Sequence, residues 1–324
     1  MLTLHPLAVV EAVLREGEEL PFLRYNVGRM SGSFDNRIHH QDLVVLLDQP
    51  LRAGETIELD FVYDMEIANY ASLLSWYPCP RGMGLELHTS RIEATYRRDH
   101  GFKATGRLVE ERMNEDKTRT AVWVAEEPID AAAFTLAQYP YEKSYTFEGL
   151  PEIVMFGTKS GYMSEEKIEG FSADIINSIN FYQRLFGTAV STDQLNVTFI
   201  ASGHGQAGSG LLHISDSIAQ PGQPGFANQG AREAFLAHEV AHEWWGHQLG
   251  WASYRDQWLS EGLAEYSAML FVEASLDNGP KLFKQFLKAS NDELTGSVAS
   301  VFSAFGRAGL ALDNKAARDR IGPI

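Results

Sequence analysis

The stretch His238-Glu239-Val240-Ala241-His242 constrains this chain more than any other. The surrounding residues, 231–247, contain no proline, and their only glycine is Gly246, so we predict a single helix there. Side chains four positions apart share one face of a helix, so the imidazoles of His238 and His242 can reach the same ion. Glu239 lies one step around the helix, where it can accept a proton from a water beside that ion without binding the ion.

A catalytic zinc ion takes three protein ligands and keeps one position open, so two histidines need a further partner. Glu261 follows His242 after eighteen intervening residues, and we predict it in the first turn of a second helix, 261–274. The pattern predicts one zinc ion per chain, bound by His238, His242 and Glu261, with Glu239 as general base of a metallopeptidase. The alternative is a chance match on an ordinary acidic helix.

The two-histidine motif and Glu261, which lies within Trp258-Leu259-Ser260-Glu261-Gly262-Leu263-Ala264, together resemble the zinc signature of the M1 aminopeptidases, a family of the gluzincins. Trp244-Trp245-Gly246 and Asp256 also fit that signature. The resemblance implies a β-rich N-terminal domain followed by a thermolysin-like catalytic domain. It also implies zinc-dependent hydrolysis of peptides. The match extends more weakly over most of the chain.

Two features of the family pattern are absent from this sequence. In the family, a tyrosine well beyond the third ligand stabilises the oxyanion, but no tyrosine follows Tyr266 here, and we expect Tyr266 in the core. The family's Gly-x-Met-Glu-Asn glutamate binds the free amine of the substrate, and its position falls on Ala207. A second amine anchor near Trp76-Tyr77-Pro78-Cys79 is also changed. We consider Glu66 as its substitute.

The departures predict that the chain is a fragment. We expect it to begin part-way through its β domain and to stop before the end of its catalytic domain, with a naturally trimmed domain as the alternative. Because loss of one oxyanion donor typically costs about 10²–10³-fold in rate, such a fragment should bind substrate analogues but turn peptides over poorly.

The glycine-rich stretch 203–210 is predicted to form a wall of the substrate cleft, since a sheet edge offers backbone hydrogen bonds to an extended peptide. We assign four residues to substrate binding: Ala207, Gly208, Gly210 and His213. A half-buried position in a strand is the alternative for His213.

Ligating histidines usually donate their second N–H to a carboxylate or carbonyl, and Asp256 and Glu265 are the candidates. A solvated helix face is the alternative for Glu265. His247 lies off the ligand face. The tryptophans are predicted to pack the two site helices together: Trp244, Trp245, Trp251 and Trp258.

Residues 1–140 are predicted to form an antiparallel β domain. Ile57, Leu59, Phe61 and Tyr63 alternate along one half-buried strand. Further strands are predicted at 43–47, 92–96, 103–109, 120–125 and 133–137. No helical stripe interrupts them, which favours a sandwich or saddle.

Residues 141–324 are predicted to form the α/β catalytic domain, so the fold class is α+β. Strands at 152–158 and 195–202 flank a helix whose apolar face begins at Ile168; Ser164 can cap its start and Gly187 can end it. A strand at 211–215 follows the glycine-rich stretch, and a third helix begins at Pro280. The signal fades from residue 295 onward.

Composition excludes several classes of protein. The chain has 324 residues with a net charge of −16, which argues against binding to nucleic acid, because few cations oppose the phosphates. No apolar run is long enough to span a membrane, and no signal sequence is apparent. Cys79 is the only cysteine, so the compartment stays open, with the cytoplasm slightly favoured. The oligomeric state and the preferred peptide side chain also stay open.

Two hypotheses about function remain. The first is an M1-like zinc metallopeptidase that acts on peptides. The second is a zinc-stabilised binding or scaffold domain without catalysis, which the missing tyrosine and glutamate favour. The retained Glu239 favours the first hypothesis, because a structural zinc site needs no base.

Overall fold

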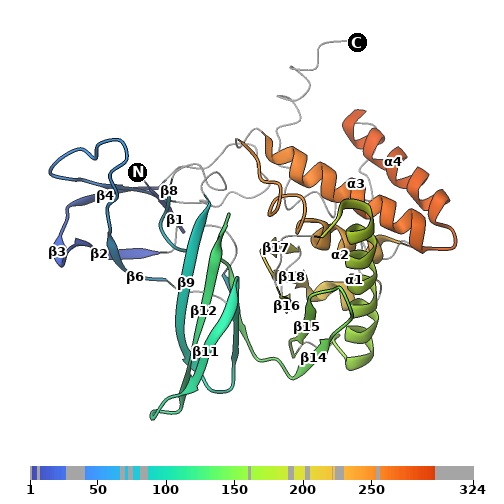
Figure 1. Cartoon of the computed structure of the whole chain (residues 1–324), viewed down its shortest axis with the longest axis horizontal. Coiled ribbons are helices and arrows are strands. Elements are labelled where there is room, and N and C mark those ends of the chain that lie inside the picture. The colour runs from blue at the N-terminus through green and yellow to red at the C-terminus, as the bar shows by residue number, and fades with distance from the viewer. Residues whose placement is uncertain are drawn as a thin grey trace.

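The computed structural model describes residues 2–5, 8–26, 41–65, 70–71, 76–80, 87–159, 162–188, 193–200, 205–220, 222, 230–252 and 256–295. Strands fill the first part of the chain, and helices α1–α4 occur only after it, as Figure 1 shows. The predicted α+β class is confirmed.

The strands of the first part pair antiparallel throughout. They form sheets in the orders β4-β5-β1-β8, β3-β2-β6, β10-β13-β7 and β11-β12-β9. Their bounds are β1 Leu2–Leu4, β2 Val9–Arg15, β3 Glu18–Glu19, β4 Phe22–Asn26, β5 Gln41–Val45, β6 Asp60–Asp64, β7 Tyr70–Ala71, β8 Cys79–Pro80, β9 His88–Arg97, β10 Gly101–Ala104, β11 Arg107–Met113, β12 Thr118–Ile129 and β13 Phe134–Ala137.

Three strand predictions need correction. The single strand expected at 103–109 is two strands, β10 and β11, because the chain bends at Gly106, which has φ of +90°. A Cβ at Gly106 would overlap the Val124 backbone, so glycine is required there. The strand expected from Ile57 begins only at Asp60, and the apolar run expected at 43–47 lies in β5, which ends at Val45.

The second part is built on one mixed sheet in the order β14-β15-β16-β18-β17. The strands β15, β16 and β18 run parallel, and β14 and β17 pair antiparallel at the two edges. The bounds are β14 Tyr141–Tyr145, β15 Glu152–Gly157, α1 Glu165–Phe186, β16 Gln194–Ile200, β17 Gln206–Gly208, β18 Leu211–Ser215, the short 3-10 helix η1 Asp216–Ala219, α2 Ala231–Ala241, α3 Gln257–Ser275 and α4 Gly279–Thr295.

Helix α1 follows its sequence prediction at both ends. The Ser164 hydroxyl accepts a hydrogen bond from the Lys167 N–H, and Gly187 ends the helix with φ of +88°. Its apolar face, which includes Ile175 and Ile179, is buried.

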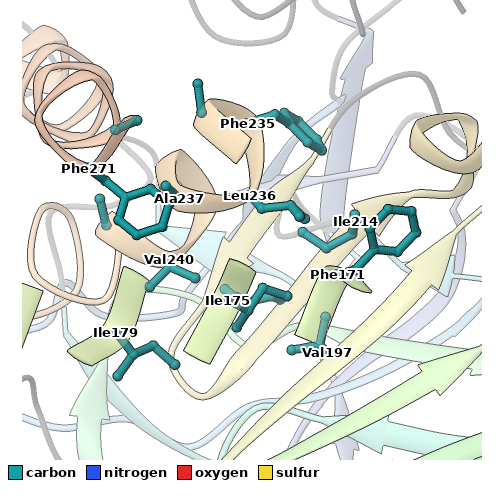
Figure 2. Close-up of a cluster of buried hydrophobic side chains, with 14 of the residues drawn as sticks. Phe171, Ile175, Ile179, Val197, Ile214, Phe235, Leu236, Ala237, Val240 and Phe271 are labelled. Atoms are coloured by element: carbon teal, nitrogen blue, oxygen red, sulfur yellow. The ribbon is translucent and has the colours of Figure 1, made fainter. Parts of the chain in front are cut away.

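Helix α2 lies inside the core of the second part. Figure 2 shows its residues Leu236 and Val240 among side chains from α1, from strands β16 and β18, and from Phe271 of α3. Both α2 residues are fully buried, as is Tyr182 of α1, whose hydroxyl donates to the Ala237 carbonyl at 3.1 Å. The hydrophobic core therefore fixes the helix that carries the two histidines.

The helix predicted at 231–247 ends at Ala241 instead. Tight turns follow, because Gly246 adopts φ of +125° and its N–H donates to the Leu249 carbonyl at 3.1 Å. The second helix starts earlier than predicted, at Gln257, so Glu261 lies in its second turn. The third helix begins at Gly279, one residue before the predicted Pro280.

The last strand of the first part ends at Ala137, and β14 joins the mixed sheet from Tyr141. The strands thus change partners near residue 140, and the domain boundary at 140/141 stays a prediction. Among the described residues, no helix has both the length and the apolar character that a membrane span requires.

Asp174 of α1 provides a test of how α1 and α2 pack. Burial raises the pKa of Asp174 to about 6, although Arg232 of α2 lies 3.3 Å away. The pKa of Asp174 in the folded protein exceeds its unfolded value of about 3.9, so folding favours the neutral carboxyl. The contribution of this preference to the free energy of unfolding is fully present below about pH 4 and is lost as the pH rises through about 6.

We therefore expect the free energy of unfolding of Asp174→Asn to rise relative to that of the wild type as the pH rises. Because the side chain is 20% exposed, we expect a relative gain of only about 1–2 kcal/mol in unfolding free energy between about pH 4 and pH 7. Urea unfolding at both pH values measures it, with Asp277→Asn at an exposed site as control. An equal difference from wild type at both pH values would contradict the expectation.

Candidate metal centre

Three ligand atoms converge between α2 and α3. The Nε2 atoms of His238 and His242 lie 3.1 Å apart, and Glu261 Oε2 lies 3.5 Å from the first and 3.7 Å from the second. Zinc bonds of about 2.0–2.2 Å in a tetrahedron place ligand atoms on the order of 3.3 Å apart. The three separations therefore fit one zinc ion, and His238, His242 and Glu261 form a candidate metal cluster in the described chain.

The other ring nitrogens have partners that orient both imidazoles. His238 Nδ1 lies 3.1 Å from Glu265 Oε2, and His242 Nδ1 lies 2.9 Å from the Trp245 carbonyl oxygen. A carbonyl only accepts, so Nδ1 of His242 carries the hydrogen and its Nε2 lone pair is free for a cation. The predicted contact of Glu265 with a ligand histidine is present. Ser260 also donates to the Trp245 carbonyl, at 2.8 Å.

The electrostatics of the cluster suit a cation. Burial opposes protonation of His238, but hydrogen bonds to Glu261 and Glu265 raise its pKa well above the usual range. Burial also opposes ionisation of Glu261, yet His238 and His242 lower its pKa to about 2. The carboxylate is therefore ionised, and a cation at the Nε2 atoms would replace the proton that it otherwise attracts.

The cluster is only partly buried. The side chains of His238, His242 and Glu261 are 15%, 12% and 26% exposed, so each keeps some contact with solvent. A catalytic zinc site needs contact with solvent, whereas a structural site is closed by a fourth protein ligand.

Glu239 lies on the same helix turn, 6% exposed. Burial raises the pKa of its carboxyl to about 7, outweighing the opposing charge of His238. A proton acceptor works best when its pKa is near the working pH, so Glu239 suits general base chemistry.

Gly205 makes the space for that carboxylate. A Cβ at this position would overlap Oε1 and Cδ of Glu239. The residue just before β17 is thus a glycine for steric reasons, and the backbone of the hairpin β17–β18 lies directly against the Glu239 carboxylate. The sequence analysis assigned no role to Gly205.

The residues assigned to substrate binding lie on the same hairpin. Gly208 is in β17 and Gly210 is in its turn, but the side chains of Ala207 and His213 are 7% and 1% exposed and belong to the packed interior. The alternative given for His213 was a half-buried strand position; His213 does lie in a strand, β18, but its side chain is fully buried. Asp256 lies at the N-terminal end of α3. Glu66 falls outside the described residues.

Trp245 links the two site helices as predicted, because it donates to Ser267 of α3 at 2.9 Å. Trp244 instead packs against α1: it is buried against Tyr182 and donates to the Gly187 carbonyl at 3.0 Å. The prediction for Trp258 was wrong, because its side chain is 54% exposed. Trp251 is half-buried.

The expectation of a core role for Tyr266 was also wrong. Tyr266 is 47% exposed, and its ring packs edge-on against Phe283 of α4, because this face of α3 points away from the site.

Three buried charged residues lie beside the cluster, and two of them, Glu243 and Asp130, had no predicted role. Glu243 accepts a hydrogen bond from the Gly210 N–H at 3.4 Å. His247, which the sequence placed off the ligand face, has its Nδ1 3.1 Å from Asp130 Oδ1, in the turn after β12. Asp130 and His247 are 117 positions apart, so no local pattern signals their contact.

Comparison with known proteins bears on this site. Residues 180–301, which include α2, α3 and all three ligand positions, match the Peptidase family M1 domain. The match to this family covers under half of the chain, and it is the part that holds the candidate metal site.

Two curated proteins that are similar to this chain are aminopeptidases. Human glutamyl aminopeptidase is 22% identical over 191 residues, which is 57% of this chain and 19% of that protein. Aminopeptidase M1-C of Oryza sativa subsp. japonica is 27% identical over 167 residues, which is 50% of this chain and 18% of that protein. The chain thus spans under a fifth of the length of the curated relatives that it matches.

Solved structures show the same fold. The M1 zinc metallopeptidase of Deinococcus radiodurans matches with a TM-score of 0.63 at 18% identity, over 89% of this chain and 66% of that one. A mutant of that protein bound to a Tyr-Ser-Ala substrate matches with a TM-score of 0.62 at 17% identity, over 89% of this chain and 66% of that one.

We expect Glu265→Gln to weaken zinc binding by about tenfold, because groups that orient a ligand histidine typically contribute 10- to 100-fold in metal affinity. Glutamine keeps a hydrogen bond to His238 Nδ1 but loses the charge. Competition with a chelator measures the affinity, and Glu273→Gln, two turns further along α3, is the matched control. Equal affinities for both variants would rule out this role of Glu265.

Proposed function

We propose that this protein is a zinc-dependent metallopeptidase of the M1 type that hydrolyses peptide bonds. The observation that carries the proposal is the convergence of His238, His242 and Glu261 on one point, with the ligand atoms all within 4.8 Å of one another and Glu239 on the same helix turn. The M1 domain match and the aminopeptidase relatives support the same reaction class.

The proposed division of work follows from the side chains. His238, His242 and Glu261 hold the zinc ion, which when bound polarises the scissile carbonyl and makes a water more acidic. Glu239 accepts the proton of the attacking water and delivers it to the leaving amine. The hairpin β17–β18 lies against Glu239 and offers its backbone to an extended peptide.

Glu239→Gln tests the base. Glutamine keeps the size and the hydrogen bonding of the side chain but accepts no proton, so we expect zinc content to be retained and peptide hydrolysis to fall by about 10²–10⁴-fold. Metal analysis and a peptidase assay on the same sample measure both. In His242→Ala we expect zinc itself to be lost.

Glu233→Gln, in the first turn of α2, is the matched control and should keep both properties. A Glu239→Gln protein with wild-type turnover would place the activity elsewhere. A wild-type protein that holds zinc but hydrolyses no peptide would favour the non-catalytic scaffold.

Recognition of the substrate's N-terminus is a separate proposal. Residues 205–215 of the hairpin include no carboxylate, and we place the family's amine-binding glutamate at Ala207, by the resemblance to the M1 pattern. A free amine opposite Ala207 would lack a charge partner, so we propose that the enzyme distinguishes weakly between free and blocked N-termini.

We expect a free peptide and its N-acetylated form to be hydrolysed with kcat/KM values within about tenfold of each other. An enzyme that binds the amine through a charged hydrogen bond, worth about 1.5–3 kcal/mol, would exceed that ratio. Assays of both peptides side by side give the answer. A larger preference for the free peptide would mean that another carboxylate binds the amine, and Glu66→Gln is then the variant to assay.

A further inference from the structure

The turn that contains Asp130 is held by hydrogen bonds and by buried neighbours within the β domain. The Trp76 indole N–H donates to the Ala132 carbonyl at 2.6 Å, and the Ala132 N–H donates to the Tyr77 hydroxyl at 3.0 Å. Ile129 and Ala132 are buried in the hydrophobic cluster of this domain. These contacts constrain the backbone on both sides of Asp130.

His247 and the Asp130 carboxylate form a largely buried contact. Nδ1 of His247 lies 3.1 Å from Oδ1 of Asp130, and the two side chains are only 6% and 17% exposed. A buried pair of this kind loses much when one partner is removed, so the contact resists displacement.

The backbone around His247 leads directly to the metal cluster. The His247 N–H donates to the His242 carbonyl at 3.3 Å, and the Leu249 N–H donates to the Trp244 carbonyl at 2.9 Å. The Trp245 carbonyl, two residues before His247, accepts from His242 Nδ1. The group that orients one candidate ligand thus belongs to the short turn that His247 anchors.

The same turn also borders the substrate hairpin. Glu243 is 5% exposed, and its carboxylate accepts from the Gly210 N–H at 3.4 Å. Residues 242–250 are consequently held by the β domain on one side and by the hairpin on the other.

We propose that Asp130 and His247 are a positioning pair, through which the β domain fixes the turn after α2 and thereby the orientation of the ligand His242. This inference rests on the proposed metal site. It makes the β domain part of the machinery that prepares the site, although the domain supplies no ligand.

The experiment compares Asp130→Ala with Asp130→Asn in the full chain. Alanine removes the acceptor for His247, whereas the asparagine carbonyl can still accept the Nδ1 hydrogen. Chelator competition measures the zinc affinity. We expect it to fall about tenfold in Asp130→Ala, which is the low end of the loss seen for groups that orient metal ligands. In Asp130→Asn we expect most of that affinity to be retained. The absorption spectrum of cobalt(II) bound in place of zinc should shift in the alanine variant alone.

Asp99 provides the matched control. It forms a His–Asp pair of the same type with His100, 2.9 Å apart and more exposed, on the β domain between β9 and β10. Asp99→Ala should leave both the zinc affinity and the cobalt spectrum at wild-type values.

Unchanged zinc affinity and cobalt spectrum in Asp130→Ala, with only lower thermal stability, would overturn the proposal and leave the pair as a contact that merely joins the domains. If Asp130→Ala does not fold, Asp130→Glu replaces it, because an extra methylene shifts the carboxylate; unchanged metal binding there has the same meaning. In a peptide assay we expect kcat to fall while KM stays within about twofold. The metal measurements decide this inference even if no peptide is hydrolysed, which would count against the proposed function alone.

Discussion

The metal cluster depends on the close packing of α2 against α3. The buried faces of the two helices carry alanines, Ala237 and Ala241 on one and Ala264 and Ala268 on the other, all at most 1% exposed. Small side chains let helix axes approach each other closely. Only then can a glutamate on α3 come within 3.5 Å of His238 Nε2. The hydrophobic core thus sets the geometry of the ligands.

Buried charge is the second constraint, because an ionised side chain inside a protein is costly unless it has a partner. Glu265 lies within hydrogen-bond distance of His238, Asp130 does so with His247, and Glu243 accepts a hydrogen bond from the Gly210 N–H. These partners come from α3, from the β domain and from the hairpin β17–β18. The hydrophobic core already packs α2 with α3 and with the hairpin, whereas the strands around Asp130 have a separate core, so the Asp130 contact adds a polar link between two cores.

The sequence predicts those parts of the molecule that depend on local spacing. The histidines four apart, the caps of α1 at Ser164 and Gly187, and the strand alternation all leave regular patterns. The early end of α2 does not, because it depends on Gly246 at φ of +125° and on a carbonyl turned toward His242. The Asp130–His247 contact spans 117 positions, and the exposure of Trp258 depends on which elements cover α3. The type of each side chain is known from the sequence, but the direction in which it points depends on tertiary packing.

The choice between an enzyme and a scaffold turns on Glu239, since the architecture serves both. A likeness to solved structures at 18% identity shows the fold alone. A zinc ion that only stabilised this fold would need three or four ligands and no neighbouring base. Here a buried glutamate with a pKa near 7 lies beside the ligands, and Gly205 lacks the side chain that would displace it. Burying that carboxyl costs stability, and a glycine adds conformational freedom to the unfolded chain. Both costs are understandable if the carboxylate must accept a proton at this place, and neither helps a site whose task ends with holding a metal.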